Sequence, residues 1–252
     1  MSFRDLEGLK RTIDSVSSQS YKNVRHIVID GGTPRIESII NKQALLKNHV
    51  FVSEPDRGIY DAMNKGLRVV ESGLVCWLNS SDVFPDVDTL SRVSNSYLES
   101  NWLWAYGGMG FTSESSKPPK IRWQYPFRKI LFKLGLRWIP HEGSYFTFDL
   151  LKKIGNYSLE LGLVADQEFI MRAAKLATPN FLPFPCVIME PGGSHSTLKG
   201  RERDKAWQNA RKMNGLLLCN SKVTDDFYVL LSPLIIKFYY QFDKLFGKQI
   251  QI

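Results

Sequence analysis

The first third of the chain alternates between helical and extended patterns, and this alternation constrains the fold more than any other feature. Apolar residues recur at helical spacing over 6–16 and again over 59–70. Short branched or wholly apolar runs at 26–29, 50–52 and 74–78 indicate strands between them. Apolar strands separated by helices are typical of a mostly parallel sheet with helices on both faces. We therefore predict an α/β fold.

Polar residues follow each predicted strand at the point where it ends. They are Asp30, Gly31 and Gly32 after the first strand, Glu54, Asp56, Gly58, Asp61 and Asn64 after the second, and Ser81 and Asp82 after the third. In open α/β sheets ligands bind beyond the carboxyl ends of the strands, so these positions predict an active site. Each group has a plainer alternative, because Asp, Asn and Gly also dominate turns and helix caps.

Particular residues within these groups suit particular chemistry. Asp61 and Asn64 are three positions apart, so they share one face of a helix. Asp82 is a carboxylate that would hold Mg²⁺ or Mn²⁺ beside a substrate phosphate, since these cations prefer oxygen ligands. Asp166 and Glu168 begin a later helix but do not share a face, so we expect one of them to point at substrate; a helix cap is the alternative. His141 and His195 lie in loops, and the sequence assigns neither a role.

Charge and composition narrow the class of protein. The 252 residues carry a net charge of +8, which favours anionic partners such as nucleotides, nucleic acid or anionic lipid. Three cysteines far apart provide neither a disulfide framework nor a zinc motif, which indicates a reducing compartment. No signal-peptide pattern opens the chain and no run has the length and apolar character of a membrane span. We expect a cytoplasmic protein, peripheral at the inner face of the cell membrane.

The middle and the end of the chain favour a membrane surface. Between 116 and 141 seven Lys and Arg residues mix with aromatic ones and no acid intervenes, as in interfacial segments. The tail over 227–246 is apolar and aromatic, which suits the headgroup layer. A solvated basic loop and a tail helix packed on the core are the alternative.

The motifs together, in this order, resemble the family-two inverting glycosyltransferases with a GT-A fold, of the exopolysaccharide and colanic-acid type. The most specific likeness is the block from Ser53 to Gly66. The segments 5–9, 26–32, 78–82 and 165–168 and the glycine turn at 192–194 are similar to the family's other blocks. The resemblance covers 5–196. It implies a GT-A domain over 1–200, with a nucleotide half at 1–110 and an acceptor half at 111–200, followed by a helical extension over 201–252.

The resemblance implies a role for each candidate residue. Asp30 would bind the nucleotide base, with Gly31, Gly32, Glu54, Asp56, Gly58, Asp61, Asn64 and Ser81 framing the donor pocket. Asp82 would hold Mn²⁺ or Mg²⁺ on the diphosphate, and Asp166 would act as the general base that deprotonates the acceptor hydroxyl. The implied partners are a nucleotide-sugar, most commonly a UDP-sugar, and a lipid-linked or polysaccharide acceptor in surface polysaccharide synthesis.

Three departures from the family pattern affect this interpretation. The family's apolar first strand has no counterpart before Asp5, so we expect a sheet without that strand; our hypothesis is that the product starts upstream or that this form is truncated and weakly active. Thr33 and Pro34 replace the family's polar continuation after Gly32. Serine takes the place of the first acid of the metal motif, which puts more weight on Asp82.

Two rival functions remain from the sequence. A non-catalytic module that binds sugar-nucleotides or polysaccharide on the same fold would fit the departures, although Asp82 and Asp166 together argue against it. A nucleic-acid-binding protein would fit the charge, but no zinc-finger or RNP signature appears and acids at strand ends repel phosphate. We therefore predict no nucleic-acid partner.

Overall fold

The computed structural model describes residues 1, 5–34, 36, 40, 49–112, 118–122, 125–190 and 201–246. Its helices are α1 (Leu6–Ser17), α3 (Ile59–Arg68), α4 (Thr89–Ser100), α5 (Lys129–Lys133), α6 (Phe148–Ile154), α7 (Ala165–Leu176), α8 (Arg201–Met213) and α9 (Lys222–Phe246). Its strands are β1 (His26–Asp30), β2 (His49–Ser53), β3 (Leu74–Val75), β4 (Trp104–Phe111), β5 (Lys120–Arg122), β6 (Ser144–Thr147) and β7 (Asn180–Met189). The predicted α/β class is confirmed.

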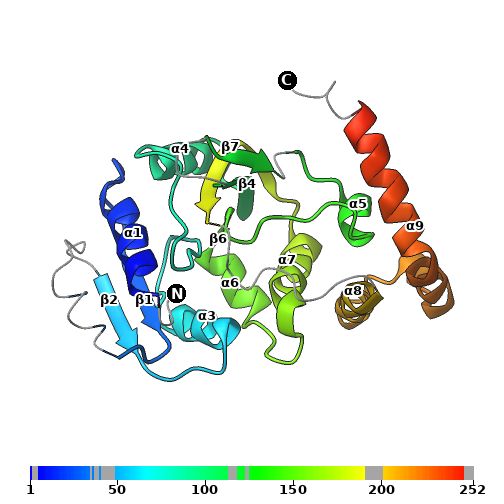
Figure 1. The fold of residues 1–252 in the computed structure, drawn as a ribbon, viewed down its shortest axis with the longest axis horizontal. Helices are drawn as coiled ribbons and strands as arrows, with labels where there is room; N and C mark the ends of the chain where they lie inside the picture. The colour runs from blue at the N-terminus through cyan, green and yellow to red at the C-terminus, as the bar shows by residue number, and fades with distance from the viewer. Residues whose placement is uncertain are drawn as a thin grey trace.

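The strands form two sheets (Figure 1). β1 and β2 pair in parallel, with His26 opposite His49 and Asp30 opposite Ser53. The second sheet has the order β3-β6-β4-β5, with β7 on β4. β4 and β7 are parallel, but β6 runs antiparallel to both of its neighbours and β5 runs antiparallel to β4. The pairing is thus mixed where the sequence suggested a mostly parallel sheet, because β5 and β6 come from the irregular middle of the chain and return in the opposite direction.

The third predicted strand is shorter than expected. We predicted a strand over 74–78, whereas ladder pairing is found only for Leu74 and Val75, opposite Thr147 and Phe146 of β6. Residues 76–78 are not part of a ladder in the described parts of the chain. The expected helix after Pro34 falls mostly on residues outside the described ranges, as does the predicted domain boundary near residue 200.

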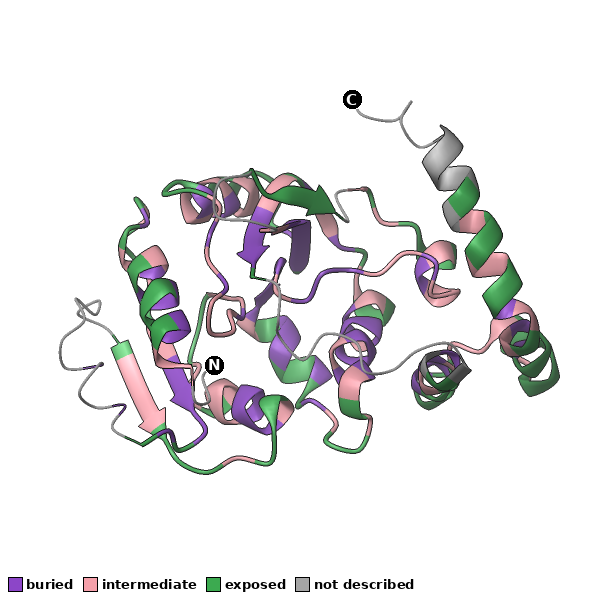
Figure 2. Cartoon of the chain, viewed as in Figure 1, coloured by how far each residue is buried: buried purple, intermediate pink, exposed green. Residues whose placement is uncertain are grey.

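A large aromatic core joins the second sheet to its helices. The Trp104 and Phe146 rings stack at 5.5 Å, and Phe169 of α7 meets Phe146 edge-on. A smaller apolar cluster holds α1 against β1 through Leu9, Ile13 and Val28. Figure 2 shows this burial concentrated in the centre of the molecule, while α9 is largely exposed.

The last helix is fixed at its beginning by a buried ion pair. Arg211 of α8 and Asp225 of α9 are joined at 2.7 Å with 1% and 0% side-chain exposure. Arg211 also donates to the carbonyl of Lys133, and Ser232 donates to Asp204 of α8 at 2.7 Å. α9 therefore packs on α8 along one face. None of the helices that the structure describes is both long and apolar enough to cross a membrane.

Candidate active site

The turn after β1 is organised by the carboxylate of Asp30. This side chain is buried and accepts four hydrogen bonds, from the backbone of Gly32 and Thr33 and from the hydroxyls of Thr33 and Ser53, at 2.7–2.9 Å. Gly32 has a φ of +86°, a conformation that favours glycine. The structure thus places Asp30, Gly31 and Gly32 together at the strand end, but the Asp30 carboxylate holds the turn itself. Its contact with a nucleotide base stays a prediction.

The loop after β2 leads into α3 through a second polar turn. Asp56 accepts from the Gly58 backbone at 2.9 Å, and Gly58 has a φ of +111° immediately before the helix. Glu54 pairs with Lys65 at 3.0 Å. Lys65 lies in α3 one turn after Asp61. The Arg57 backbone and guanidinium both donate to Asp61, which lowers the pKa of that carboxyl.

Asn64 binds a residue that lies 93 positions later in the chain. Its amide exchanges two hydrogen bonds with the backbone of Tyr157, at 3.0 and 2.8 Å. Asp61 and Asn64 therefore use their polar groups on the protein, and their part in framing a donor pocket stays a prediction.

The turn at 79–82 connects three parts of the chain. Asp82 is 3% exposed and its carboxylate accepts from the Asn79 backbone at 3.1 Å. Ser81, with a φ of +76°, donates to Asp5, the residue that caps α1, and accepts from Arg11. Asp82 and Asp30 both act electrostatically on the buried amino group of Met1, so the ends of β1 and of the 74–82 segment lie near one another.

Asp166 lies in the first turn of α7. Of the two acids in that turn, it is the one without a salt bridge in the described structure. Burial, together with the negative charge of Glu142, raises its pKa to about 7. Glu168 instead pairs with Arg172 at 2.9 Å and accepts from Asn214 of α8 at 2.9 Å. The expectation that the two acids point different ways agrees with these partners.

Glu142 is a candidate site residue that the sequence did not single out. It precedes β6, accepts from the Asn79 side chain at 3.1 Å, and burial raises its pKa. Its charge also contributes to raising the pKa of Asp82 to about 7, after the larger effect of burial. Glu142 thus links Asp82 and Asp166 into one cluster, which we call the acid cluster. The signal in the sequence that could have indicated Glu142 is an acid close before the aromatic-rich run 145–148.

Aromatic residues close one side of the acid cluster. Burial and then the charge of Asp166 raise the pKa of Tyr60 above its ordinary range. His141 is 1% exposed, meets the Tyr157 hydroxyl at 2.7 Å, and burial lowers its pKa to about 3. His141 is therefore a neutral core residue. His195 and the glycine turn at 192–194 lie outside the described residues.

Comparison with known proteins identifies the family of the chain. The family model described as Glycosyl transferase family 2 matches residues 2–150. The chain belongs to this family and is a glycosyltransferase.

Its relatives include an uncharacterized glycosyltransferase of Mycobacterium tuberculosis, 34% identical over 224 residues that cover 86% of this chain and 81% of the relative. A PGL/p-HBAD biosynthesis glycosyltransferase of Mycobacterium bovis is 28% identical over 65% of this chain and 63% of its own.

Solved structures share the fold. Staphylococcus aureus TarS in complex with UDP-GlcNAc superimposes with a TM-score of 0.67 at 16% identity, covering 91% of this chain and 70% of that one. The mannosyltransferase PcManGT of Pyrobaculum calidifontis, in complex with GDP-Man and Mn²⁺, gives 0.61 at 15% identity, covering 95% and 71%. The predicted GT-A fold is confirmed by these likenesses.

Proposed function

We propose that the protein is an inverting transferase that moves a sugar from a nucleotide-sugar, a UDP-sugar by preference, to a hydroxyl of a lipid-linked or polysaccharide acceptor. The pathway we propose is surface polysaccharide synthesis of the exopolysaccharide or O-antigen kind. Family membership supports the reaction class. Proteins of the same fold bind UDP-GlcNAc and GDP-Man, which supports a nucleotide-sugar donor.

The acid cluster is the observation that carries the proposal. Asp166 has a pKa of about 7 and both of its neighbours in the cluster are acids, which is the setting of a general base poised near neutral pH. In the proposed step the acceptor oxygen bonds to the anomeric carbon as its proton passes to Asp166. The bond from that carbon to the diphosphate breaks on the opposite face, which inverts the configuration.

The oxygen atoms of the acid cluster and of Asn79 fit a divalent cation that is held jointly with the substrate. Asp82 and Glu142 repel one another as anions, and the buried Asn79 Oδ1 atom has no hydrogen-bond partner. The described residues contain no group of three His, Cys, Asp or Glu side chains that could hold a metal ion. Mn²⁺ and Mg²⁺ commonly keep few protein ligands and take substrate phosphates as others. When bound, the cation would neutralise charge on the leaving diphosphate, with Asp82 as its protein ligand.

The outer face of α9 supports a membrane-linked acceptor. Five large apolar side chains that are 58–78% exposed follow one another at helical spacing on this face: Val223, Phe227, Leu230, Leu234 and Phe238. The opposite face carries Asp225, Tyr228 and Ser232, which are buried against the rest of the protein. Exposed Lys129 and Ile130 lie on α5, which Figure 1 shows between the body and α9. We propose peripheral attachment to an anionic inner membrane surface through this stripe.

A non-catalytic sugar-nucleotide-binding module is the alternative on the same fold. Binding alone gives no reason to gather three carboxylates, one buried and two half-buried, whose charges oppose one another, since poorly solvated charge is costly. The acid cluster therefore favours catalysis.

Turnover of a donor panel tests the proposal. We would incubate the whole chain with UDP-, GDP- and dTDP-sugars and Mn²⁺, and measure nucleotide release with and without membrane lipid extract. We expect release from one donor, increased by the extract, and its loss in Asp82→Asn and Asp166→Asn. Asp149→Asn, an exposed acid on α6, is the matched control and should retain activity. Saturable donor binding without release under every condition would favour the binding module.

A further inference from the structure

Gln167 is a buried amide that directly follows the proposed base. Its side chain lies in the first turn of α7 and the residue is 2% exposed, whereas glutamine is mostly found at protein surfaces. The next two residues of the helix, Phe169 after Glu168 and then Ile170, belong to the aromatic core. Burying an amide is costly unless it is hydrogen-bonded, so the partners of Gln167 show what the side chain contributes.

The amide group of Gln167 faces two acceptors. Nε2 donates to the Ile139 carbonyl at 3.0 Å and makes a longer hydrogen bond of 3.4 Å to Asp166 Oδ2. The Gln167 backbone N–H donates to the other carboxylate oxygen, Asp166 Oδ1, at 2.7 Å. A carbonyl and an ionised carboxylate can only accept, so the NH₂ side of the amide must face them. Gln167 thus supplies one donor to each oxygen of the proposed base.

The oxygen of the same amide is left without a hydrogen bond. The buried Oε1 atom of Gln167 has no partner among the residues that the structure describes. An acceptor buried in this way destabilises the folded state. A methionine would fill a similar volume without the unpartnered oxygen, so packing alone does not explain an amide at this position.

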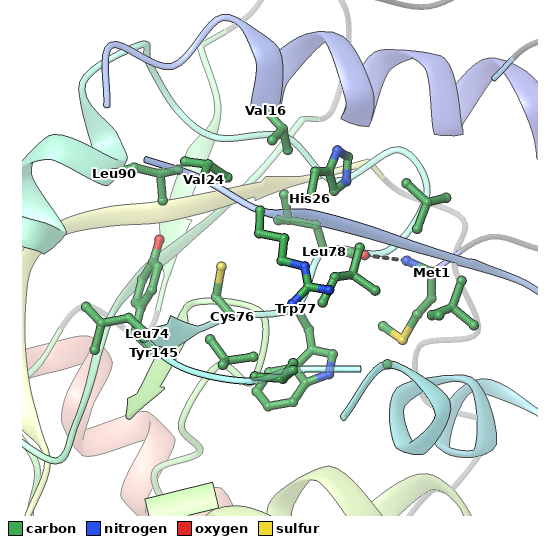
Figure 3. A pocket seen from close by; sticks show the side chains of 18 of the residues that line it. Met1, Val16, Val24, His26, Leu74, Cys76, Trp77, Leu78, Leu90 and Tyr145 are labelled. Atoms are coloured by element: carbon green, nitrogen blue, oxygen red, sulfur yellow. Dashed lines mark hydrogen bonds between the residues drawn. The ribbon is translucent and has the colours of Figure 1, made fainter. Parts of the chain in front are cut away.

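The first turn of α7 has anchors other than the Gln167 side chain. Glu168 accepts from Asn214 of α8 at 2.9 Å. Phe169 is fully buried and meets the Trp77 ring edge-on at 5.8 Å, and Figure 3 shows Trp77 at the wall of a cavity of about 400 Å³ beside β1. These contacts hold the start of the helix in place independently of the Gln167 amide.

Burial and a neighbouring acid favour the protonated form of Asp166. Burial and then the charge of Glu142 raise the pKa of Asp166 to about 7, and the hydrogen bonds from Gln167 oppose that rise. Burial, followed by the charge of Asp166, raises the pKa of the hydroxyls of Tyr60 on α3 and of Tyr157, so both rings lie near this carboxyl. Of these neighbours, Gln167 is the one whose donors favour the ionised carboxylate.

We propose that Gln167 is the positioning residue of the base: its amide fixes the orientation of the Asp166 carboxylate and favours the ionised form that accepts the proton of the acceptor hydroxyl. The inference rests on the proposed function of Asp166. A base that is already ionised and oriented is ready when the acceptor oxygen attacks. The hydrogen bond from Nε2 to Ile139 O also ties α7 to the segment that leads to Glu142, so the same amide holds two members of the acid cluster near each other.

Substitution of the amide by an apolar side chain of similar size tests the proposal. Gln167→Met removes the donor to Asp166 Oδ2 and keeps the backbone donor to Oδ1. With the nucleotide-sugar that the donor panel identifies, we expect kcat at about pH 6.5 to fall by about tenfold and to recover to within about threefold of the parent at about pH 9, with little change in KM. An equal loss at both pH values, or no loss at the lower one, would overturn the proposal.

Two further variants separate the amide's effect on the base from its effect on folding. Gln167→Glu has the same shape, and its protonated carboxyl can donate to Ile139 O but not also to Asp166, so we expect the same dependence on pH. Gln208→Met removes an exposed amide that pairs with Asp226 and is the matched control, with an unchanged profile. Gln167→Met exchanges one unpartnered acceptor, Oε1, for another, Ile139 O, so its Tm should change by less than about 4 °C. If neither Gln167 variant folds, the amide is a structural residue and the proposal is wrong.

A titration without substrate distinguishes this inference from the proposed activity. Carbon-13 NMR of the aspartate carboxyls, with the Asp166 signal assigned from Asp166→Asn, follows its protonation directly. We expect Asp166 to titrate at a higher pH in Gln167→Met than in the parent and in Gln208→Met. An unchanged midpoint would overturn the proposal whatever the turnover shows. A midpoint that moves while the parent turns over no nucleotide-sugar would leave Gln167 as the positioning residue of Asp166 and reject the proposed function.

Discussion

Asn64 and Tyr157 are joined by a closed pair of hydrogen bonds although they lie 93 residues apart. Asn64 Nδ2 donates to the Tyr157 carbonyl at 3.0 Å, and the Tyr157 backbone N–H donates to Asn64 Oδ1 at 2.8 Å. Both residues are buried. The side chain thereby fastens α3, which follows the predicted donor loop, to the segment that leads to Asp166.

Removing this amide should destabilise the protein. Asn64→Ala leaves a buried N–H and a buried carbonyl without partners, so we expect the free energy of unfolding to fall by about 2–4 kcal/mol. Asn95→Ala, at an exposed position of α4, should change it by less than about 0.5 kcal/mol. Urea denaturation of both variants measures the difference. Similar values for the two would show that the hydrogen-bond pair contributes little.

Asp166→Asn should abolish most catalysis while preserving the fold. The amide keeps the shape of the side chain but accepts no proton, so we expect kcat to fall by about 10²–10⁴. The donor Kd, measured by calorimetry, should change little, because Asp166 is proposed to act on the acceptor. A variant that loses donor affinity and keeps kcat would assign Asp166 to the donor pocket instead.

The acid cluster should make stability depend on pH. Burial raises the pKa of Asp82 to about 7, so as pH rises from about 4 to 7 the unfolded chain loses this proton while the folded chain keeps it. The stabilising contribution is present at low pH and is lost through this window. We expect Asp82→Asn to exceed the parent in unfolding free energy by about 1–3 kcal/mol at pH 8 and to differ little at pH 4. Urea denaturation at both values checks this, and a gain independent of pH would contradict it.

Two adjacent acids of α9 should respond differently to substitution. Asp225 is fully buried against Arg211, so Asp225→Ala leaves an unpaired buried guanidinium and should cost about 3–5 kcal/mol. Asp226 pairs with Lys222 on the surface, and Asp226→Ala should cost less than about 1 kcal/mol. Thermal denaturation of the pair gives the comparison. Equal small losses would mean that α9 is not anchored by the buried pair.

Vesicle flotation should depend on the exposed stripe of α9. Leu230→Glu places a charge in the middle of the stripe, and we expect binding to anionic vesicles to fall by about tenfold or more. Leu98→Glu is the matched control, because Leu98 is 75% exposed on α4, away from α9. If both variants and the parent float equally, or if the parent does not float at low salt, the membrane attachment is wrong.

Acids at strand ends and helix starts are easier to recognise in a sequence than the path of the strands. Asp82 and Asp166 were predicted from an acid after an apolar strand and an acid at a helix start, which are local signals. Glu142 was missed because its importance depends on Asn79 and the two aspartates, which only the tertiary fold brings near it.

The order of the strands likewise depends on the tertiary fold more than on local sequence patterns. The parallel pairing of β1 with β2 followed from two apolar runs separated by a predicted helix. The antiparallel place of β6 between β3 and β4 had no such signal, because strand order depends on long-range packing. Similarly, the hydrogen bonds that occupy the carboxylate of Asp30 depend on Ser53 of β2, which no local pattern in the Asp-Gly-Gly turn reveals.

The raised pKa of Asp82 would connect cation binding to proton release. Near neutral pH this carboxyl holds a substantial share of its proton, and a divalent cation on Asp82 would displace that proton into solution. The heat of loading the enzyme with Mn²⁺ and nucleotide would then contain the ionisation enthalpy of the buffer. The enzyme would consequently bind its donor complex more tightly on the alkaline side of neutrality, so that the ambient pH itself would become a control on sugar transfer.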